Sequence, residues 1–277
     1  MKVFLTGATG YIGSAVLDRL QQKGHGVKAL ARSEESAQKL ASWGAEICRG
    51  DLEHPGAWRQ AAGACDAVVH TAMSWGTNSG VMDRAVVESV LDALDGTGKT
   101  FLYTSGVWVM GDTKGRLAGE MFPLKPASIV AWRPAVERLV LEAGDRRIRG
   151  IVVRPAMVYG RGGGAVHRLK SGELPLIGGG ENHWSFVHVD DLADLYVLAL
   201  ENSGPGELYL AAHGAPQLWK DVALAAGCEK SLSLEEARKL LGPIAEALII
   251  DQKVGSTKAA RVLGWRPSRP QVLEELR

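Results

Sequence analysis

Residues Thr6-Gly7-Ala8-Thr9-Gly10-Tyr11-Ile12-Gly13 decide the fold of this 277-residue chain. The stretch begins at the end of Val3–Thr6, a run typical of a buried strand. It opens a helical pattern that ends at Gly24 and Gly26. Glycines let the backbone turn tightly and approach a pyrophosphate, while the helix presents unpaired N–H groups and its positive dipole end. A tight structural turn is the alternative, but the position after an N-terminal strand favours a dinucleotide site.

Outward from this loop, short β-rich runs alternate with helical patterns. Strands are expected at Val3–Thr6, Val27–Ala31, Glu46–Cys48, Asp66–Thr71, Thr100–Ser105 and Ile148–Val153. Helices are expected after the loop, after an N-cap at Ser33, from about Val81 to Leu94, and from near Pro134. This alternation predicts an α/β fold, a Rossmann-type doubly wound parallel sheet with a small C-terminal substrate-binding region.

The alternation of strands and helices stops after the sixth expected strand. Residues 160–188 are rich in glycine and show little periodicity, so we expect an insertion or lid rather than another sheet layer. A helix at Asp190–Leu200 and a strand at Glu207–Ala211 follow, and the remainder is expected to be helical. We therefore assign 1–160, with 186–212 returning to it, to an NADP-binding Rossmann domain, and 161–185 and 213–277 to a substrate-binding or lid region.

The end of the second expected strand bears on the choice between NAD and NADP. An acid that binds the ribose is expected roughly 20 residues past the loop, but the strand ends Leu30-Ala31-Arg32-Ser33. Arg32 can pair with a 2′-phosphate and Ser33 can donate a hydrogen bond to it, although a solvated surface charge is the alternative for Arg32. After the third strand, Asp51 can accept a hydrogen bond from the adenine amino group, or it can cap the next helix. NADP(H) is therefore the expected cofactor.

Bulk composition excludes several classes of function. Apolar residues make up 46% and charged residues 23%, as in soluble globular proteins, and the net charge of +1 predicts neither nucleic acid nor a membrane surface as a partner. The cysteines, Cys48, Cys65 and Cys228, show neither zinc spacing nor a secretory framework. Since the N-terminal apolar run is too short for a signal peptide and no stretch reaches the length of a membrane span, a cytoplasmic protein is expected.

Several segments together resemble one family. Thr6–Gly13 is similar to its Thr-Gly-x-x-Gly-x-x-Gly loop, Asp51-Leu52 to its adenine-binding pair, and His70-Thr71-Ala72 to the segment that passes the nicotinamide ribose. Arg154–Gly160 resembles its Arg-Pro-x-x-Val-Tyr-Gly stretch, Phe186–Asp191 its Phe-Val-His-Val-Asp-Asp helix entry, and Leu263–Pro267 its closing Leu-Gly-Trp-x-Pro. In this order they resemble the extended and atypical short-chain dehydrogenase/reductase superfamily of NAD(P)-dependent, epimerase-like proteins, and the likeness covers nearly the whole chain.

The resemblance implies a set of cofactor-binding residues. They are Gly7, Thr9, Gly10, Tyr11, Ile12, Gly13, Arg32, Ser33, Asp51, Leu52, Thr71, Ala72, Met73, Arg133, Pro155, Met157 and Val158. The family's chemistry uses a Ser/Thr that orients the substrate oxygen, a Tyr that transfers its proton and a Lys that lowers the tyrosine's pKa. Aligned with this pattern, the chain has Gly106 at the hydroxyl position, Ile129 at the Tyr position and Arg133 at the Lys position. Isoleucine cannot transfer a proton and arginine is no proton relay, so the usual catalytic triad is expected to be absent.

Three other groups are candidates for catalysis. Ser105 ends the fifth strand, where open α/β sheets place ligands, and its alternative is a hydrogen bond to the neighbouring loop. Tyr159 has the right functional group, but its position is usually structural in the family. Arg133 can hold the ribose or a substrate carboxylate, and its alternative is an exposed helix charge.

Other polar and aromatic residues complete the candidate sites. Trp75, Trp108 and Trp184 are candidates for an apolar or aromatic substrate pocket, with core packing as the alternative. His183, His188 and Asp190 match no familiar zinc spacing, so no metal site is expected.

The first hypothesis for function is an NADP-dependent reductase of a small carbonyl or related compound, with a proton drawn from Ser105, Tyr159, substrate or water. A redox epimerase or dehydratase is compatible with the fold, but the missing Tyr and Lys count against it. A catalytically idle protein that senses the NADP redox state is the second hypothesis, and a scaffold without nucleotide is the third. A small-molecule substrate is the expected partner, and a homodimer stays open because many relatives pair through the helices flanking the fifth strand.

Overall fold

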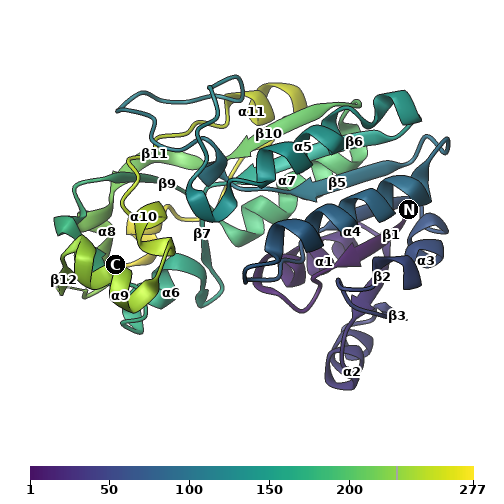
Figure 1. Ribbon diagram of the computed structural model, residues 1–277, viewed down its shortest axis with the longest axis horizontal. Coiled ribbons are helices and arrows are strands. Elements are labelled where there is room, and N and C mark those ends of the chain that lie inside the picture. Colours follow the sequence, from purple (N-terminus) through teal and green to yellow (C-terminus); the bar gives the residue numbers. More distant parts are fainter. Residues whose placement is uncertain (229) are drawn as a thin grey trace. The chain divides into compact units, whose positions relative to one another are not determined.

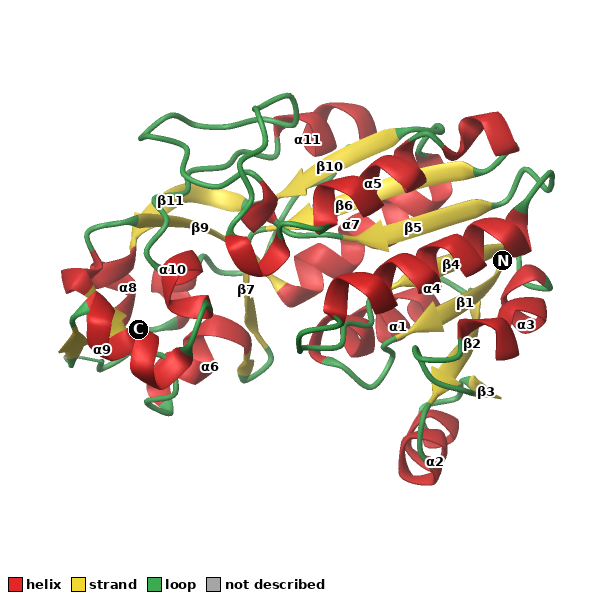
Figure 2. Cartoon of the chain, viewed as in Figure 1, coloured by secondary structure: helices red, strands yellow, loops and turns green. Residues whose placement is uncertain are grey.

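The computed structural model describes residues 1–228 and 230–277, which form the helices and strands drawn in Figures 1 and 2. These residues divide into two compact units, and each is described by itself. The first unit consists of Met1–Ser105, Ala135–Val153 and Ala193–Leu208. The second consists of Gly106–Pro134, Arg154–Leu192 and Tyr209–Arg277.

A seven-stranded sheet in the order β10-β6-β5-β4-β1-β2-β3 organises the first unit. Its strands are β1 (Lys2–Thr6), β2 (Gly26–Ala31), β3 (Glu46–Arg49), β4 (Ala67–His70), β5 (Thr100–Thr104), β6 (Arg149–Pro155) and β10 (Glu207–Ala211). Neighbouring strands from β6 to β3 pair in parallel, and β10 runs in the same direction in Figure 2. The chain winds outward from β1 on one side and from β4 on the other, which places the topological switch point between these two strands.

Helices cover both faces of this sheet. They are α1 (Tyr11–Gln22), α2 (Glu34–Ser42), α3 (Arg59–Gly63), α4 (Ser79–Leu94), α5 (Arg133–Leu141) and α7 (Val189–Asn202). In Figure 1, α4 and α5 lie in front of the sheet and α1 and α7 lie behind it. Because both faces are covered, strand residues such as Phe4 and Leu102 are completely buried. The predicted doubly wound α/β fold is therefore confirmed.

The second unit contains a three-stranded sheet in the order β11-β9-β7 and a two-stranded sheet of β12 and β8. The strands are β7 (Met157–Gly160), β8 (Leu176–Ile177), β9 (His183–His188), β11 (His213–Leu218) and β12 (Ser231–Leu232). The helices are α6 (Gly164–Lys170), α8 (Trp219–Ala225), α9 (Leu234–Leu241), α10 (Ile244–Leu248), α11 (Thr257–Leu263) and α12 (Val272–Glu275). Buried aromatic side chains of β9 and α8, Trp184, Phe186 and Trp219, belong to its core.

Two expectations for the C-terminal half are wrong. The glycine-rich segment supplies α6 and the strands β8 and β9, where an insertion without sheet was expected. All but the first residue of β9 are buried, so the strand lacks the alternation of a half-exposed one, and most glycines of the segment have positive φ, as at Gly178 and Gly179. The region after Ala211 is also not all helical, because β11 pairs antiparallel with β9. Pro216 of β11 argues against a strand when the sequence is considered alone, but β11 lies at the edge of its sheet, where proline is tolerated.

The division into units differs from the expected domain bounds. Gly106–Pro134 and residues 154–160, 186–192 and 209–212 belong to the second unit, although they were assigned to the Rossmann domain. Residues 107–130 explain part of the difference, because Val107, Val109 and Met110 share an apolar cluster with Val254 and other residues of the second unit. Sequence alone does not reveal that long-range packing.

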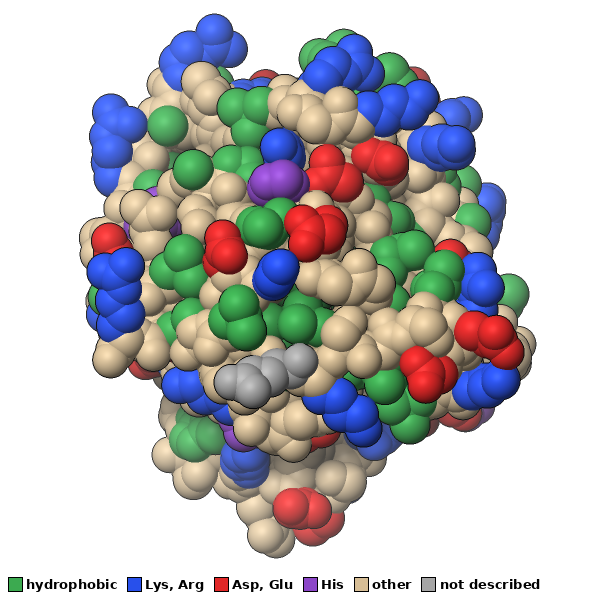
Figure 3. All heavy atoms as spheres, turned by 90° about the vertical axis from the view of Figure 1, so that its left-hand side faces the viewer, with side chains coloured by type: hydrophobic (Ala, Val, Ile, Leu, Met, Phe, Trp, Pro, Cys, Tyr) green, Lys and Arg blue, Asp and Glu red, His purple; other side chains and the backbone are tan. Residues whose placement is uncertain are grey.

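Two further observations concern the surface. Among the described residues, no helix is both long and apolar enough to cross a membrane. On the face drawn in Figure 3, acidic and basic side chains are interspersed without a large region of either sign.

Candidate functional site

The glycine loop between β1 and α1 is built so that no side chain fits at two of its positions. Gly7 adopts a φ of +77°, and a Cβ there would lie 2.6 Å from the backbone nitrogen of Ala72. A Cβ at Gly13 would lie 2.0 Å from the carbonyl oxygen of Gly7. The helix starts after Gly10, which provides no capping side chain, and its first turn contains no acidic residue. A cradle of this kind, with uncapped N–H groups, fits a pyrophosphate.

Ser33 and Arg32 follow β2, at the same edge of the sheet. Ser33 is the N-cap of α2, as predicted, because its Oγ accepts a hydrogen bond from the backbone N–H of Ser36 at 3.1 Å. Arg32 is exposed, and it forms no hydrogen bond or ion pair with the rest of the described chain. Its guanidinium is therefore available to an anion from solution.

Arg49 is a basic neighbour of this position that the sequence analysis missed. It ends β3 in register with Ala31, and its Nη1 donates a hydrogen bond to the carbonyl oxygen of Ser33 at 2.6 Å. The same nitrogen lies 3.5 Å from a carboxylate oxygen of Glu34. Glu34, the acid next to Ser33 in the sequence, is thus paired with an arginine. The signal was a second arginine at the end of the neighbouring strand, but only the β2–β3 register shows that the two strand ends meet.

Asp51 forms local contacts but does not cap the next helix, because the N-cap of the 3₁₀ helix Pro55–Ala57 is His54, without a side-chain cap. Its Oδ1 accepts a hydrogen bond from the backbone N–H of His54 at 2.8 Å, and its carbonyl oxygen accepts one from the indole N–H of Trp58 at 2.7 Å. The bond from the His54 backbone, together with the His54 side chain, lowers the pKa of the Asp51 carboxyl. Asp51 and the neighbouring Leu52 are half-buried.

The segments after β4 and β5 lie at the carboxyl edge of the sheet. Thr71 donates its hydroxyl to the carbonyl oxygen of Thr6 at 2.7 Å, and Ala72 and Met73 follow it, partly buried. Ser105 is 5% exposed, and its Oγ has no hydrogen-bond partner among the described residues. Its alternative role, a side-chain bond to the neighbouring loop, is therefore wrong for this structure. A buried hydroxyl without a partner at a sheet's carboxyl edge is suited to a ligand atom.

The second unit uses Tyr159 as a structural contact. Its hydroxyl donates a hydrogen bond to the carbonyl oxygen of Pro270 at 2.7 Å, and its ring meets His188 edge-on. Burial, together with the nearby carboxylates of Glu275 and Asp191, raises the pKa of Tyr159. A hydroxyl that is buried, engaged and of raised pKa is a poor proton donor, so the geometry favours the structural alternative.

Arg133 also belongs to the second unit, and the alternative of an exposed helix charge is wrong. It is 7% exposed, and its guanidinium carbon lies 5.0 Å from the ring centroid of Trp132. Ile129 is partly buried against an apolar cluster. Pro155 is buried at the end of β6, and Met157 and Val158 are partly buried in β7.

The three candidate tryptophans lie in different environments. Trp184 stacks on Trp219 at 4.0 Å between ring centroids and is buried in the core of the second unit, which matches its packing alternative. Trp108 is partly buried beside the same cluster. Trp75, in the first unit, is 66% exposed. Of the three, Trp75 alone is mostly exposed.

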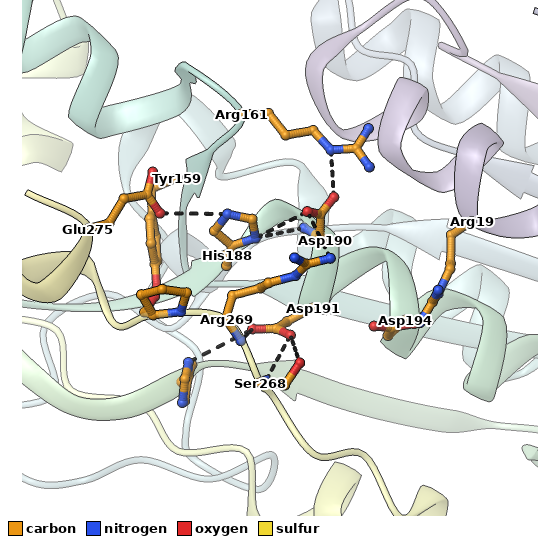
Figure 4. A network of polar contacts seen from close by, with 12 residues as sticks. Arg19, Tyr159, Arg161, His188, Asp190, Asp191, Asp194, Ser268, Arg269 and Glu275 are labelled. Atoms are coloured by element: carbon orange, nitrogen blue, oxygen red, sulfur yellow. Dashed lines mark hydrogen bonds and ion pairs between the residues drawn. The ribbon is translucent and has the colours of Figure 1, made fainter. Parts of the chain in front are cut away.

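Histidine and aspartate residues at the entry to α7 form a structural network, shown in Figure 4. The backbone N–H of Asp190 donates to Nδ1 of His188 at 3.1 Å, and the Asp190 carboxylate pairs with Arg161 and Arg269. Asp191 accepts hydrogen bonds from the backbone N–H groups of Ser268 and Arg269. These contacts hold the C-terminal segment of the second unit, and no group of three or more metal-ligating side chains occurs in the described residues.

Comparison with known proteins places the chain in a family. Residues 3–212 match the model of the NAD dependent epimerase/dehydratase family. The chain belongs to this family. Uncharacterized protein YLL056C of Saccharomyces cerevisiae is 32% identical over 297 residues, covering 100% of this chain and 98% of the relative.

Two further relatives carry informative names. A 4-hydroxy-2-methyl-3-oxo-4-farnesyl-3,4-dihydroquinoline-1-oxide ketoreductase of Stigmatella aurantiaca is 32% identical over 231 residues, covering 78% of this chain and 69% of the relative. A human epimerase family protein solved with NADPH has a TM-score of 0.76 at 22% identity, covering 100% of this chain and 99% of that chain. The structural likeness confirms the fold that the motifs predicted.

Proposed function

We propose that this protein is an NADP(H)-dependent oxidoreductase that reduces a small carbonyl compound. The observation that carries the cofactor choice is the pair of arginines after β2 and β3: Arg32 has no partner in the described chain, while Arg49 pairs with Glu34. A 2′-phosphate fits these charges, whereas the carboxylate that would bind a ribose 2′-hydroxyl is missing from the strand end. The NADPH of the human family member supports the same choice.

The ketoreductase relative supports reduction as the reaction. The cofactor, when bound, supplies hydride to the carbonyl carbon, and the carbonyl oxygen takes a proton. In this proposal the buried Ser105 hydroxyl donates a hydrogen bond to that oxygen and orients it, and water supplies the proton, since Tyr159 already donates to Pro270. Trp75, exposed in the first unit, is the proposed apolar contact for the substrate.

A titration followed by fluorescence tests the cofactor assignment. Wild-type protein is expected to bind NADPH much more tightly than NADH. Arg32→Ala is expected to weaken NADPH binding by about tenfold and to leave NADH binding nearly unchanged, because one charge-assisted contact to the phosphate is lost. Arg49→Ala is expected to reduce the preference for NADPH by a smaller factor, since it frees Glu34 beside the site.

Arg84→Ala is the control for both variants. Arg84 is an exposed arginine of the first unit, and like Arg49 it pairs with a glutamate, Glu88. Equal loss of NADPH affinity in the Arg32 and Arg84 variants would contradict the assignment. A carbonyl panel then tests turnover. Failure of the wild type to bind either cofactor would overturn the proposal as a whole.

A second candidate function is a redox sensor that binds NADP(H) without turnover. The engaged hydroxyl of Tyr159 favours it, because this proton is already donated to Pro270, and Ile129 and Arg133 occupy the aligned Tyr and Lys positions. Tight NADPH binding without oxidation on any carbonyl of the panel would select it over the reductase. We further propose a cytoplasmic location, which the three free cysteines, Cys48, Cys65 and Cys228, support.

A further inference from the structure

A buried polar network connects three strand ends of the first unit. Thr6 Oγ1 lies 2.6 Å from Nδ1 of His70, and Nε2 of the same ring lies 3.2 Å from Oδ1 of Asp83. Tyr103 donates its hydroxyl to Oδ2 of Asp83 at 2.5 Å, and its ring stacks on His70. All four side chains are less than 10% exposed. A single carboxylate from α4 thus joins the ends of β1, β4 and β5.

The chemistry of these side chains fixes which group donates and which accepts in each hydrogen bond of the network. A carboxylate accepts hydrogen bonds, so the His70 Nε2–H and the Tyr103 O–H both donate to Asp83. In the neutral imidazole, Nδ1 is then left as an acceptor for the Thr6 hydroxyl. Asp83 therefore selects the tautomer of His70, and through it the orientation of the Thr6 side chain.

Each joined strand end leads directly into a segment of the candidate site. Gly7 follows Thr6, and its backbone packs so closely on Ala72 that no Cβ fits between them. Thr71 follows His70 and donates both its hydroxyl and its backbone N–H to the Thr6 carbonyl oxygen, at 2.7 and 3.2 Å. Ser105 follows β5, two residues after Tyr103.

We propose that Asp83 is a positioning residue, which sets the glycine loop, the 71–73 segment and Ser105 relative to one another through Thr6, His70 and Tyr103. It contacts no reacting atom in this proposal. The inference rests on the proposed function in that these segments bind a nicotinamide cofactor. Removing a side chain of the network is expected to increase the mobility of the glycine loop without unfolding the protein. The strands keep their backbone hydrogen bonds to one another and their buried apolar side chains.

Strand β5 offers a matched pair of variants. Tyr103→Phe removes the hydroxyl at its carboxyl end that Asp83 accepts. Thr100→Val removes a buried hydroxyl at its amino end, which accepts a hydrogen bond from Nε of Arg149 at 2.7 Å. Each change removes one side-chain hydrogen bond made by a buried hydroxyl of the same strand, so a general loss of stability affects both variants. Asp83→Asn is the stronger variant on the network side.

Two readouts test the proposal: the dissociation constant for NADPH, and amide hydrogen exchange of residues 7–13 and 71–73 in protein without cofactor. Asp83→Asn is expected to weaken NADPH binding by about tenfold and Tyr103→Phe by about threefold, each with faster exchange in both segments. Thr100→Val is expected to stay within about twofold of wild type with unchanged exchange. Where Asp83→Asn does not fold, Tyr103→Phe decides.

Equal effects of Tyr103→Phe and Thr100→Val on affinity and exchange would overturn the positioning role. This outcome is distinct from failure of the proposed function. If the wild type binds neither cofactor, the proposed function is overturned, while hydrogen exchange in the cofactor-free protein still decides whether the network orders the loop.

Discussion

The candidate site residues of the two units differ in whether the fold already provides them with partners. In the first unit, Ser105 Oγ and the Arg32 guanidinium form no hydrogen bond or ion pair with the described chain. In the second unit, the Tyr159 hydroxyl donates to Pro270 and the Asp191 carboxylate receives two backbone N–H groups. A reactive residue type is therefore a weak guide by itself, and the informative feature is whether the fold already satisfies it.

The glycine loop gives the largest expected effect. Gly13→Ala places a methyl group 2.0 Å from the Gly7 carbonyl oxygen, so the loop must shift and NADPH binding is expected to fall by about 100-fold. Gly26→Ala is the control, because a Cβ at Gly26 meets nothing within 4 Å and its φ is not positive. Fluorescence titration measures both variants. Equal affinities in the two would show that the cradle does not hold the cofactor.

This loop also shows which parts of the fold were predictable. The strand, the turn and the N-cap at Ser33 depend on residues within a few positions of one another, and the expectations for them are confirmed. Strands β9 and β11 were missed because their pairing is long-range, and because burial and Pro216 conceal the strand pattern. Local chemistry is visible in sequence, whereas pairing between distant segments is not.

The same distinction explains the candidate site. The phosphate cradle and Arg32 could be found from a motif and its spacing. Arg49 depends on the β2–β3 register, and Asp83 acts across 20 residues to Tyr103, so neither stands out in the sequence. The Tyr159 contact spans 111 residues to Pro270, which is why sequence analysis left its role open.

A pair of hydroxyl deletions tests the contrast between the units directly. Ser105→Ala is expected to lower kcat for a carbonyl substrate by about 30-fold, because the group that orients the substrate oxygen is lost. Tyr159→Phe is expected to change kcat by less than about threefold and to cost about 1 kcal/mol in the free energy of unfolding, because it removes one hydrogen bond to Pro270. Steady-state kinetics and denaturant unfolding measure the pair. The reverse ranking in kcat would assign the proton transfer to Tyr159.

The smallest effect concerns the pH dependence of a satisfied carboxylate in the second unit. Burial raises the pKa of Asp251, but hydrogen bonds from the His183 backbone and ring outweigh it, so the folded-state pKa lies below the ordinary value. A carboxyl whose pKa is lower in the folded state stabilises the fold at pH values above the pKa of the unfolded chain, which is about 4. This contribution is lost as the pH falls through the lower pKa of the folded state. The difference in unfolding free energy between wild type and Asp251→Asn, about 1 kcal/mol at pH 5, is expected to shrink toward pH 2.

Glu235→Gln, which removes an exposed partner of Lys239, is expected to show a smaller change. A wild-type advantage that stays constant from pH 5 to pH 2 would mean that the His183 contacts do not favour the ionised form, and that Asp251 is held by packing alone.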